Sequence, residues 1–378
     1  MTIEGIKTLH IIPEGNEPFI ELCNHYLGYF SSSKFDSTVL YLIGFNDQKT
    51  REQTNTGKII FWELKGSSLK LTPANLIRFY QLIKKEKYDL VVCHSHASLI
   101  MACLVNILTP VYKIIGISYK NGEFASKFIN SFIYLCKKRV RLFGVLKSIQ
   151  LDICENLKAM PAEYIQASCF SLDYRKIRHE RLSRAEAKTR LNIRQGRFVF
   201  GVRHESGVDD DIFSILTAFS YTRDKIKQGV LVVFCERKHQ TTISKKVKAL
   251  LIESVVIFRY DLTSFSHYSR VFDGIIVTCN PDNMSIGLLQ SMVSGLPVIA
   301  TKLPANIEYI GKAGYLYDRG DAYQLTYYME LLYSLTPEER MELKKKVLAR
   351  INEDFTPQVC RQKFQALPMV QKFLYEDI

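Results

Sequence analysis

Polar side chains that could hold an anion gather between residues 273 and 301, where a predicted buried strand gives way to a predicted helix. Asp282, Asn283 and Ser285 follow an apolar β-branched run, and an apolar series with helical spacing begins at Ile286. The first turn of a helix presents free backbone N–H groups and the positive end of the helix dipole, which together favour phosphate binding. An ordinary strand–helix–strand unit without a ligand gives the same pattern, so this stretch alone favours neither interpretation.

The length and composition predict a folded protein of two domains with an anionic partner. The 378 residues suit two domains of ordinary size, and a hydrophobic fraction of 47% excludes a disordered chain. The formal net charge of +13 predicts nucleic acid, an anionic membrane surface or phosphorylated ligands as partners. Nucleic acid ranks last and is not expected, because the chain contains no aromatic and basic module of a known kind.

The nine cysteines are scattered without a CxxC pair or another close metal-ligand spacing. We therefore predict buried free thiols in a reducing compartment, instead of disulfides or a zinc site. The N-terminal apolar run is too short for a signal peptide, and no apolar run approaches the length of a membrane span. These observations predict a cytoplasmic protein.

Strand-like and helix-like segments alternate in two series, which predicts an α/β fold with parallel sheets. The first series begins with the strand Lys7–Ile12 and the second with the strand Phe198–Val202. A stretch rich in Arg and Lys, residues 174 to 197, separates them as a linker with a short helix. We expect an N-terminal domain over 1–173 on the acceptor side and a C-terminal domain over 174–359 that binds the donor. The tail 360–378 is free to pack back on the first domain.

The second half of the chain resembles retaining glycosyltransferases of the GT-B fold, sugar-transferase family 4. Ser294–Ile299 (SGLPVI) matches the family's turn between helix and strand, and Phe200–Arg203 (FGVR) resembles the strand that ends in a phosphate-binding arginine. The resemblance covers roughly residues 165 to 360. It implies two Rossmann-like domains facing each other across a cleft, a nucleotide-sugar donor, retention of anomeric configuration, and neither a metal nor a cofactor.

The family's two acidic positions are both altered in this chain. Asp282 stands where the first Glu is expected, near the sugar, and Gln290 stands at the second, near the ribose of the nucleotide. The lysine that follows the arginine in the family is absent, and Arg237 or Lys238 could replace the missing cation. The resemblance implies Asp282 as a catalytic residue and a donor site formed by Arg203, Asn283, Met284, Ser285, Ile286, Gly287, Gln290 and Gly15, to which we add Lys238 as the candidate cation.

Arg203 carries the chemical argument, because the leaving group of a nucleotide sugar is a diphosphate. A guanidinium can make two parallel hydrogen bonds to a phosphate as negative charge grows on it, which a lysine cannot. The simpler alternative for Arg203 is a surface ion pair with Glu205 or with an aspartate of residues 209 to 211.

His94 and His96 follow the predicted strand Tyr88–Cys93 and are expected to face the cleft. A histidine there could orient a sugar hydroxyl or accept a proton from the acceptor, so both are candidate catalytic residues. The alternative is a structural role, which histidines more often have. The family's usual glycine pair in the first strand-to-helix turn is reduced to Gly15.

Residues 126 to 150 mix apolar and basic residues, without an acidic residue between Glu123 and Asp152. A basic amphipathic helix of this kind can lie on an anionic membrane, and a core helix with a basic rim is the alternative. We expect transfer of a sugar to an anionic, lipid-linked or surface-polysaccharide or lipopolysaccharide acceptor, with peripheral association on the inner face of the membrane. The alternatives are a non-catalytic GT-B homologue that binds a partner or a glycan, and a nucleotide-sugar epimerase.

Overall fold

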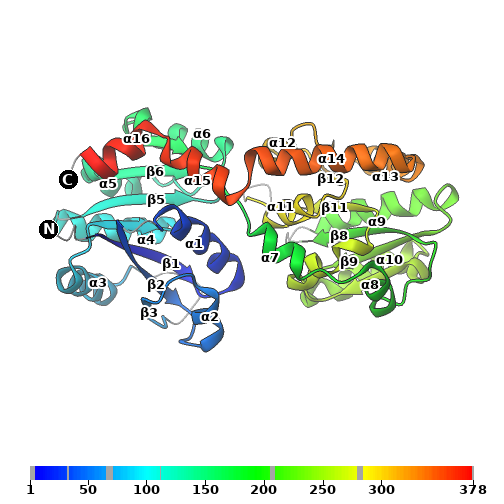
Figure 1. Cartoon of the computed structure of the whole chain (residues 1–378), viewed down its shortest axis with the longest axis horizontal. Helices are drawn as coiled ribbons and strands as arrows, with labels where there is room; N and C mark the ends of the chain where they lie inside the picture. Colours follow the sequence, from blue (N-terminus) through cyan, green and yellow to red (C-terminus); the bar gives the residue numbers. More distant parts are fainter. Residues whose placement is uncertain are drawn as a thin grey trace. The chain divides into compact units, whose positions relative to one another are not determined.

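The computed structural model describes residues 5–31, 34–64, 71–110, 112–204, 209–278 and 284–376. The chain divides into two compact units (Figure 1). Unit 1 comprises Met1–Ser171 and Pro357–Ile378, and unit 2 comprises Leu172–Thr356. The chain therefore crosses between the units twice, beside the domain boundaries expected after residues 173 and 359.

Unit 1 is built on a seven-stranded parallel sheet with the strand order β3-β2-β1-β4-β5-β6-β7. The central strands are runs of Val, Ile and Leu with almost no exposed side chains, as expected for parallel strands covered on both faces. The strands are β1 (Ile6–Glu14), β2 (Phe35–Ile43), β3 (Ile59–Phe61), β4 (Leu90–Cys93), β5 (Lys113–Ser118), β6 (Val140–Gly144) and β7 (Ile165–Ala167).

Most helices of unit 1 connect successive strands, whereas α15 and α16 belong to the C-terminal tail, and some begin at side-chain caps that the sequence supplies. Ser95 and Ser98 form a capping box at the start of α4, and Thr72 caps α3. The helices are α1 (Glu17–Tyr29), α2 (Gln48–Gln53), α3 (Pro73–Glu86), α4 (His96–Leu108), α5 (Lys127–Leu135), α6 (Lys147–Asn156), α15 (Pro357–Gln365) and α16 (Pro368–Gln371), with short turns η1 (Lys137–Arg139), η2 (Ala162–Tyr164) and η7 (Lys372–Glu376).

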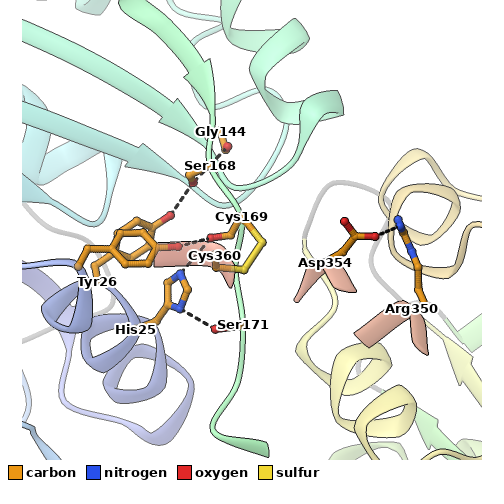
Figure 2. Close-up of a disulfide and its surroundings, with 10 residues drawn as sticks. His25, Tyr26, Gly144, Ser168, Cys169, Ser171, Arg350, Asp354 and Cys360 are labelled. Atoms are coloured by element: carbon orange, nitrogen blue, oxygen red, sulfur yellow. Dashed lines mark hydrogen bonds and ion pairs between the residues drawn. A yellow bond between two sulfur atoms is a disulfide. The ribbon is translucent and has the colours of Figure 1, made fainter. Parts of the chain in front are cut away.

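The C-terminal tail packs on unit 1 through α15, whose Phe364 is 2% exposed and stacks on Tyr29 at 4.6 Å between ring centroids. A disulfide joins Cys360 of α15 to Cys169, and Figure 2 shows this bond beside His25 and Ser171. The prediction that the cysteines are free thiols is therefore wrong for this pair. The two residues are 191 positions apart, and the spacing of cysteines along a sequence does not reveal a contact made by the returning tail.

Unit 2 is built on a six-stranded parallel sheet with the order β10-β9-β8-β11-β12-β13. The helix α11 ends at the predicted turn, where Gly295 adopts a φ of 70° that a residue with a side chain rarely adopts. The strands are β8 (Phe198–His204), β9 (Gly229–Phe234), β10 (Val256–Arg259), β11 (Gly274–Thr278), β12 (Val298–Thr301) and β13 (Tyr315–Tyr317).

In unit 2, the helices α9, α10 and α13 pack their apolar faces against this sheet in one core cluster that includes Phe219, Val233 and Met329. The helices are α7 (Tyr174–His179), α8 (Arg184–Arg190), α9 (Asp209–Tyr221), α10 (Gln240–Ala249), α11 (Ile286–Val293), α12 (Pro304–Ile310), α13 (Ala322–Ser334) and α14 (Pro337–Asp354), with short turns η3 (Thr222–Asp224), η4 (Arg237–His239), η5 (Glu253–Val255) and η6 (Thr263–Val271).

Residues 126 to 150 do not form one amphipathic helix, so that prediction is wrong. They form α5, the turn η1, the strand β6 and the start of α6. The apolar residues of the second half are core residues, since Val140 and Leu142 of β6 are fully buried. In the described part of the chain, none of the helices combines the length and hydrophobicity that a membrane span requires.

Candidate functional site

The carboxyl ends of β8 and β11 lie side by side in unit 2, and polar residues occupy both. Arg203 pairs in register with Val277, and His204 pairs with Thr278. The strand order reverses at this point, because β9 and β10 extend from β8 on one side while β11 to β13 extend on the other. In open α/β sheets such a reversal opens a crevice at the carboxyl ends of the strands, which is where ligands bind.

Arg203 and Gln290, both predicted to bind a donor, are brought together at this point. The Nη1 of Arg203 donates to the Oε1 of Gln290 at 2.8 Å and to the carbonyl oxygen of Leu262 at 2.9 Å. The guanidinium also lies 5.7 Å from the ring centroid of Phe265, and both Arg203 and Gln290 are half-buried. These contacts fix the orientation of the planar guanidinium group.

The helix α11 starts beside this pair, since Gln290 belongs to it. The hydroxyl of Ser285 accepts a hydrogen bond from the backbone N–H of Leu288 at 3.0 Å and so caps the helix. Met284, Ser285 and Gly287 are buried, whereas Ile286 is half-buried. Asp282 and Asn283 lie outside the described residues. The serine therefore acts as a cap, and a ligand contact at this helix start would be made by backbone groups.

Lys238 lies in η4, the turn that follows β9, and its exposed ammonium forms an ion pair with Glu236. The next residue, His239, packs its ring against His204 at 5.3 Å between centroids. His204 is 1% exposed, and its Nδ1 lies 3.0 Å from the hydroxyl of Thr278. His204 was not among the predicted site residues, although its place at the end of the apolar run of β8 indicated this location.

The alternative role of Arg203 was an ion pair with an aspartate of residues 209 to 211. One of these aspartates, Asp211, pairs with a different arginine. Asp211 is 2% exposed and accepts two hydrogen bonds from Arg319, at 2.8 and 3.3 Å. Glu205 lies outside the described residues. The buried carboxylate of Asp211 is thus neutralised by the loop after β13.

Unit 1 has its own strand-order reversal, between β1 and β4, and Gly15 and His94 follow those two strands. The N–H of Gly15 donates to the carbonyl oxygen of Ile43 at 3.0 Å, and its own carbonyl oxygen accepts from the hydroxyl of Thr50 at 3.4 Å. Both backbone groups of this glycine therefore have partners inside unit 1.

His94 is 1% exposed, and both of its ring nitrogens lie within hydrogen-bonding distance of other side chains of unit 1. Its Nε2 lies 3.2 Å from the Nδ1 of His10, and its Nδ1 lies 2.7 Å from the hydroxyl of Tyr119. Burial, reinforced by His10 and His25, lowers the pKa of His94 well below its usual value. Burial likewise raises the pKa of Tyr119 well above its usual value. These neutral groups form a hydrogen-bonded network that the sequence analysis missed.

His96 is the first residue of α4, and it is half-buried with its ring 5.0 Å from that of Phe124. Burial and, to a smaller degree, the nearby Lys120 lower its pKa. Its Nε2 is buried without a hydrogen-bond partner among the described residues. His96 is therefore the more accessible of the two candidate histidines. Over the described ranges, no cluster of three or more His, Cys, Asp or Glu side chains is arranged to hold a metal ion.

No protein-family model matches the chain, and no curated protein matches its sequence. Solved structures are similar to it at low sequence identity. A glycosyltransferase from Rickettsia africae has a TM-score of 0.79 at 14% identity, covering 99% of this chain and 100% of that one. Anabaena Alr3699/HepE in complex with UDP-glucose has a TM-score of 0.75 at 15% identity, covering 94% and 97%.

The apo form of the lipopolysaccharide outer core galactosyltransferase WaaB is also similar, with a TM-score of 0.66 at 14% identity over 98% of this chain and 100% of that one. These likenesses extend over whole chains and agree with the two parallel sheets. They show that the chain has the GT-B fold of two Rossmann-like domains, which confirms the predicted fold class.

Proposed function

We propose that the chain is a glycosyltransferase that moves a sugar from a nucleotide-sugar donor to an acceptor with retention of configuration. The observation that supports this best is the half-buried Arg203, held by Gln290 and by the carbonyl oxygen of Leu262 where the strand order of unit 2 reverses. A cation fixed at that point is suited to a diphosphate group.

In this proposal, unit 2 stabilises the leaving group. As the bond between the sugar C1 and the phosphate oxygen breaks, negative charge grows on the diphosphate. Arg203 would offer hydrogen bonds to it, and the first turn of α11 would add backbone N–H donors. Gln290 would bind a ribose hydroxyl, for which an amide can act as donor or acceptor. Asp282 would lie near the sugar, and neither a metal nor a cofactor is part of the proposal.

The fold neighbours support the donor class. One of them was solved in complex with UDP-glucose, and another is a galactosyltransferase of the lipopolysaccharide outer core. The net charge of +13 suits an anionic acceptor, and we propose a lipid-linked or surface-polysaccharide or lipopolysaccharide acceptor met at the inner face of a membrane. The cytoplasm is the proposed location.

Nucleotide-sugar binding tests the proposal directly. UDP-glucose and a panel of other nucleotide sugars should raise the melting temperature of the purified protein, and at least one should be slowly hydrolysed. Arg203→Ala should abolish both effects, while Arg190→Ala should preserve them, because Arg190 is an exposed arginine paired with Glu186 on α8. If none of the nucleotide sugars binds, the enzyme proposal fails. If hydrolysis persists unchanged in Arg203→Ala, the site assignment fails.

A second candidate function is a non-catalytic GT-B protein that binds a partner or a glycan. The hydrogen bond between Arg203 and Gln290 favours it, because an uncharged amide occupies a position where the family has a carboxylate. This function predicts donor binding without turnover, and an Asp282→Ala variant indistinguishable from the wild type. Loss of hydrolysis in Asp282→Ala, with donor binding retained, would exclude it.

A further inference from the structure

Three large aliphatic side chains are exposed together at the C-terminal ends of α4 and α5 in unit 1. Leu108 is 76% exposed, Leu135 is 71% exposed and Ile107 is 43% exposed. We call these three residues the apolar tip. Exposed aliphatic side chains are ordinary when single, but a group of them at one place marks an interaction surface.

The helices α4 and α5 touch near these ends, which brings the apolar tip to one side of unit 1. The thiol of Cys136, which follows Leu135, lies 3.3 Å from the carbonyl oxygen of Cys103 in α4. Ile107 follows Cys103 by one helical turn and so extends from the same side of α4. The helices α4 and α5 also pack along each other.

Basic residues flank the apolar tip on two sides. Lys137 and Lys138 are exposed in η1, directly after α5, and Arg139 follows them. On the other side α3 packs against α4, and its C-terminal end carries the exposed residues Lys84, Lys85 and Lys87. These six residues are the basic flanks. The acidic residues within the same segments are Glu86, which pairs with Lys85 at 3.5 Å, and Asp89.

Cations at the C-terminal end of a helix stabilise the helix dipole, which gives Lys84 and Lys85 a structural role. That role does not explain why aliphatic side chains between the two groups of cations remain in water. An anionic lipid bilayer accounts for both, because acyl chains receive the apolar side chains while phosphate headgroups attract the cations.

We propose that the apolar tip and the basic flanks dock unit 1 onto the surface of an anionic membrane. Helices in parallel α/β units run antiparallel to the strands, so their C-terminal ends lie at the amino edge of the sheet. Gly15 and His94 lie at the opposite, carboxyl edge. Docking in this way therefore leaves the carboxyl edge of unit 1 uncovered. The inference concerns this surface alone and does not depend on the transferase reaction.

Co-sedimentation of the full chain with vesicles tests the inference. The wild type should bind vesicles of phosphatidylcholine mixed with phosphatidylglycerol, bind pure phosphatidylcholine poorly, and dissociate as salt is raised. Leu108→Glu/Leu135→Glu should lower binding about tenfold or more, because it places charge where apolar side chains insert. Leu251→Glu is the matched control, since Leu251 is 86% exposed in unit 2, and it should bind like the wild type.

A second pair of variants separates a local effect from the overall charge. Lys137→Glu/Lys138→Glu should lower binding, whereas Lys344→Glu/Lys345→Glu, the same charge change on exposed positions of α14, should not. Equal loss in both variants, or equal binding by Leu108→Glu/Leu135→Glu and the wild type, would overturn the inference. So would a wild-type dimer in solution that becomes a monomer in Leu108→Glu/Leu135→Glu, which would identify the tip as a self-association face. Thermal shifts with UDP-glucose in each variant separate these results from failure of the donor site.

Discussion

The two units share one topology, yet they use the point where their strand order reverses in opposite ways. In unit 1 this point lies between β1 and β4, and the buried His10 and His94 there are within hydrogen-bonding distance of each other, while His94 also contacts Tyr119. In unit 2 it lies between β8 and β11, and Arg203 and Gln290 remain half-buried beside the start of α11.

The difference shows which polar groups are available for a ligand. His94 is neutral and enclosed, with a lowered pKa, so its hydrogen bonds stabilise the interior of unit 1. Arg203 keeps a positive charge and is partly accessible, so it can meet an anion. A residue at the carboxyl end of a parallel strand is therefore a site candidate only when its polar groups can be reached.

The C-terminal tail is attached to unit 1 by the disulfide between Cys169 and Cys360. Cys360→Ser should lower the free energy of unfolding of unit 1 by about 2–5 kcal/mol. Urea denaturation checks this, and a reductant should bring the wild type to the same value. Cys154→Ser, at a partly exposed free thiol, is the matched control and should change little. A wild type that is unaffected by reductant would contradict the contribution of the disulfide.

Removal of the Arg203 side chain tests the strand-order reversal of unit 2. Arg203→Ala should weaken binding of whichever nucleotide sugar gives the largest thermal shift by about 3 kcal/mol, or about 100-fold, because a charged partner of the diphosphate is lost. Arg203→Lys should recover part of the affinity, since it restores the charge without the planar pair of donors. Isothermal titration calorimetry measures both, and equal affinity in all three proteins would show that unit 2 binds its ligand elsewhere.

The sequence predicted two parallel sheets, because buried parallel strands are short runs of Val, Ile and Leu, but it missed β6, which lies within the helix predicted over residues 126 to 150. Through the resemblance to a family, it also singled out Arg203 and Gln290, which the structure brings together, and their role in donor binding stays a prediction. It could not predict their mutual hydrogen bond, because they are 87 residues apart and meet only when β8 and α11 are assembled. The role of Asp282 stays a prediction.

The errors have a common physical cause, which is that a residue's surroundings come from distant segments. His94 was expected to face a cleft, but His10 and Tyr119, which enclose it, belong to β1 and to the residue after β5. Residues 126 to 150 have a composition typical of an amphipathic helix, but β6 uses their apolar residues within the sheet. Composition does not distinguish a side chain that faces lipid from one that faces the core.

Replacement of His94 separates a structural role from a catalytic one. His94→Ala should destabilise unit 1 by about 2–4 kcal/mol, because it leaves a cavity and removes the hydrogen-bond partner of His10. Affinity for the nucleotide sugar that binds the wild type should stay within about twofold in the variant. His267→Ala, at a histidine whose side chain is 41% exposed, is the control and should shift stability by less than about 0.5 kcal/mol. Loss of turnover without loss of stability would restore the catalytic interpretation of His94.

The pH dependence of unfolding tests whether the interior of unit 1 excludes charge. Burial lowers the pKa of His10 to about 3, and its Nε2 is buried without a hydrogen-bond partner in the described part of unit 1. As the pH falls, His10 of the unfolded chain therefore binds a proton near pH 6.5, whereas His10 of the folded chain stays neutral until about pH 3. Above pH 6.5 His10 therefore does not reduce the free energy of unfolding. Below that pH, the free energy of unfolding falls by about 1.4 kcal/mol for each pH unit. His10→Phe should make the slope of stability against pH shallower by that amount, whereas Phe30→Leu, at a neighbouring ring, should change the stability but not the slope. Parallel curves for the wild type and His10→Phe would mean that a proton reaches His10 in the folded protein, and that unit 1 is as open at its strand reversal as unit 2.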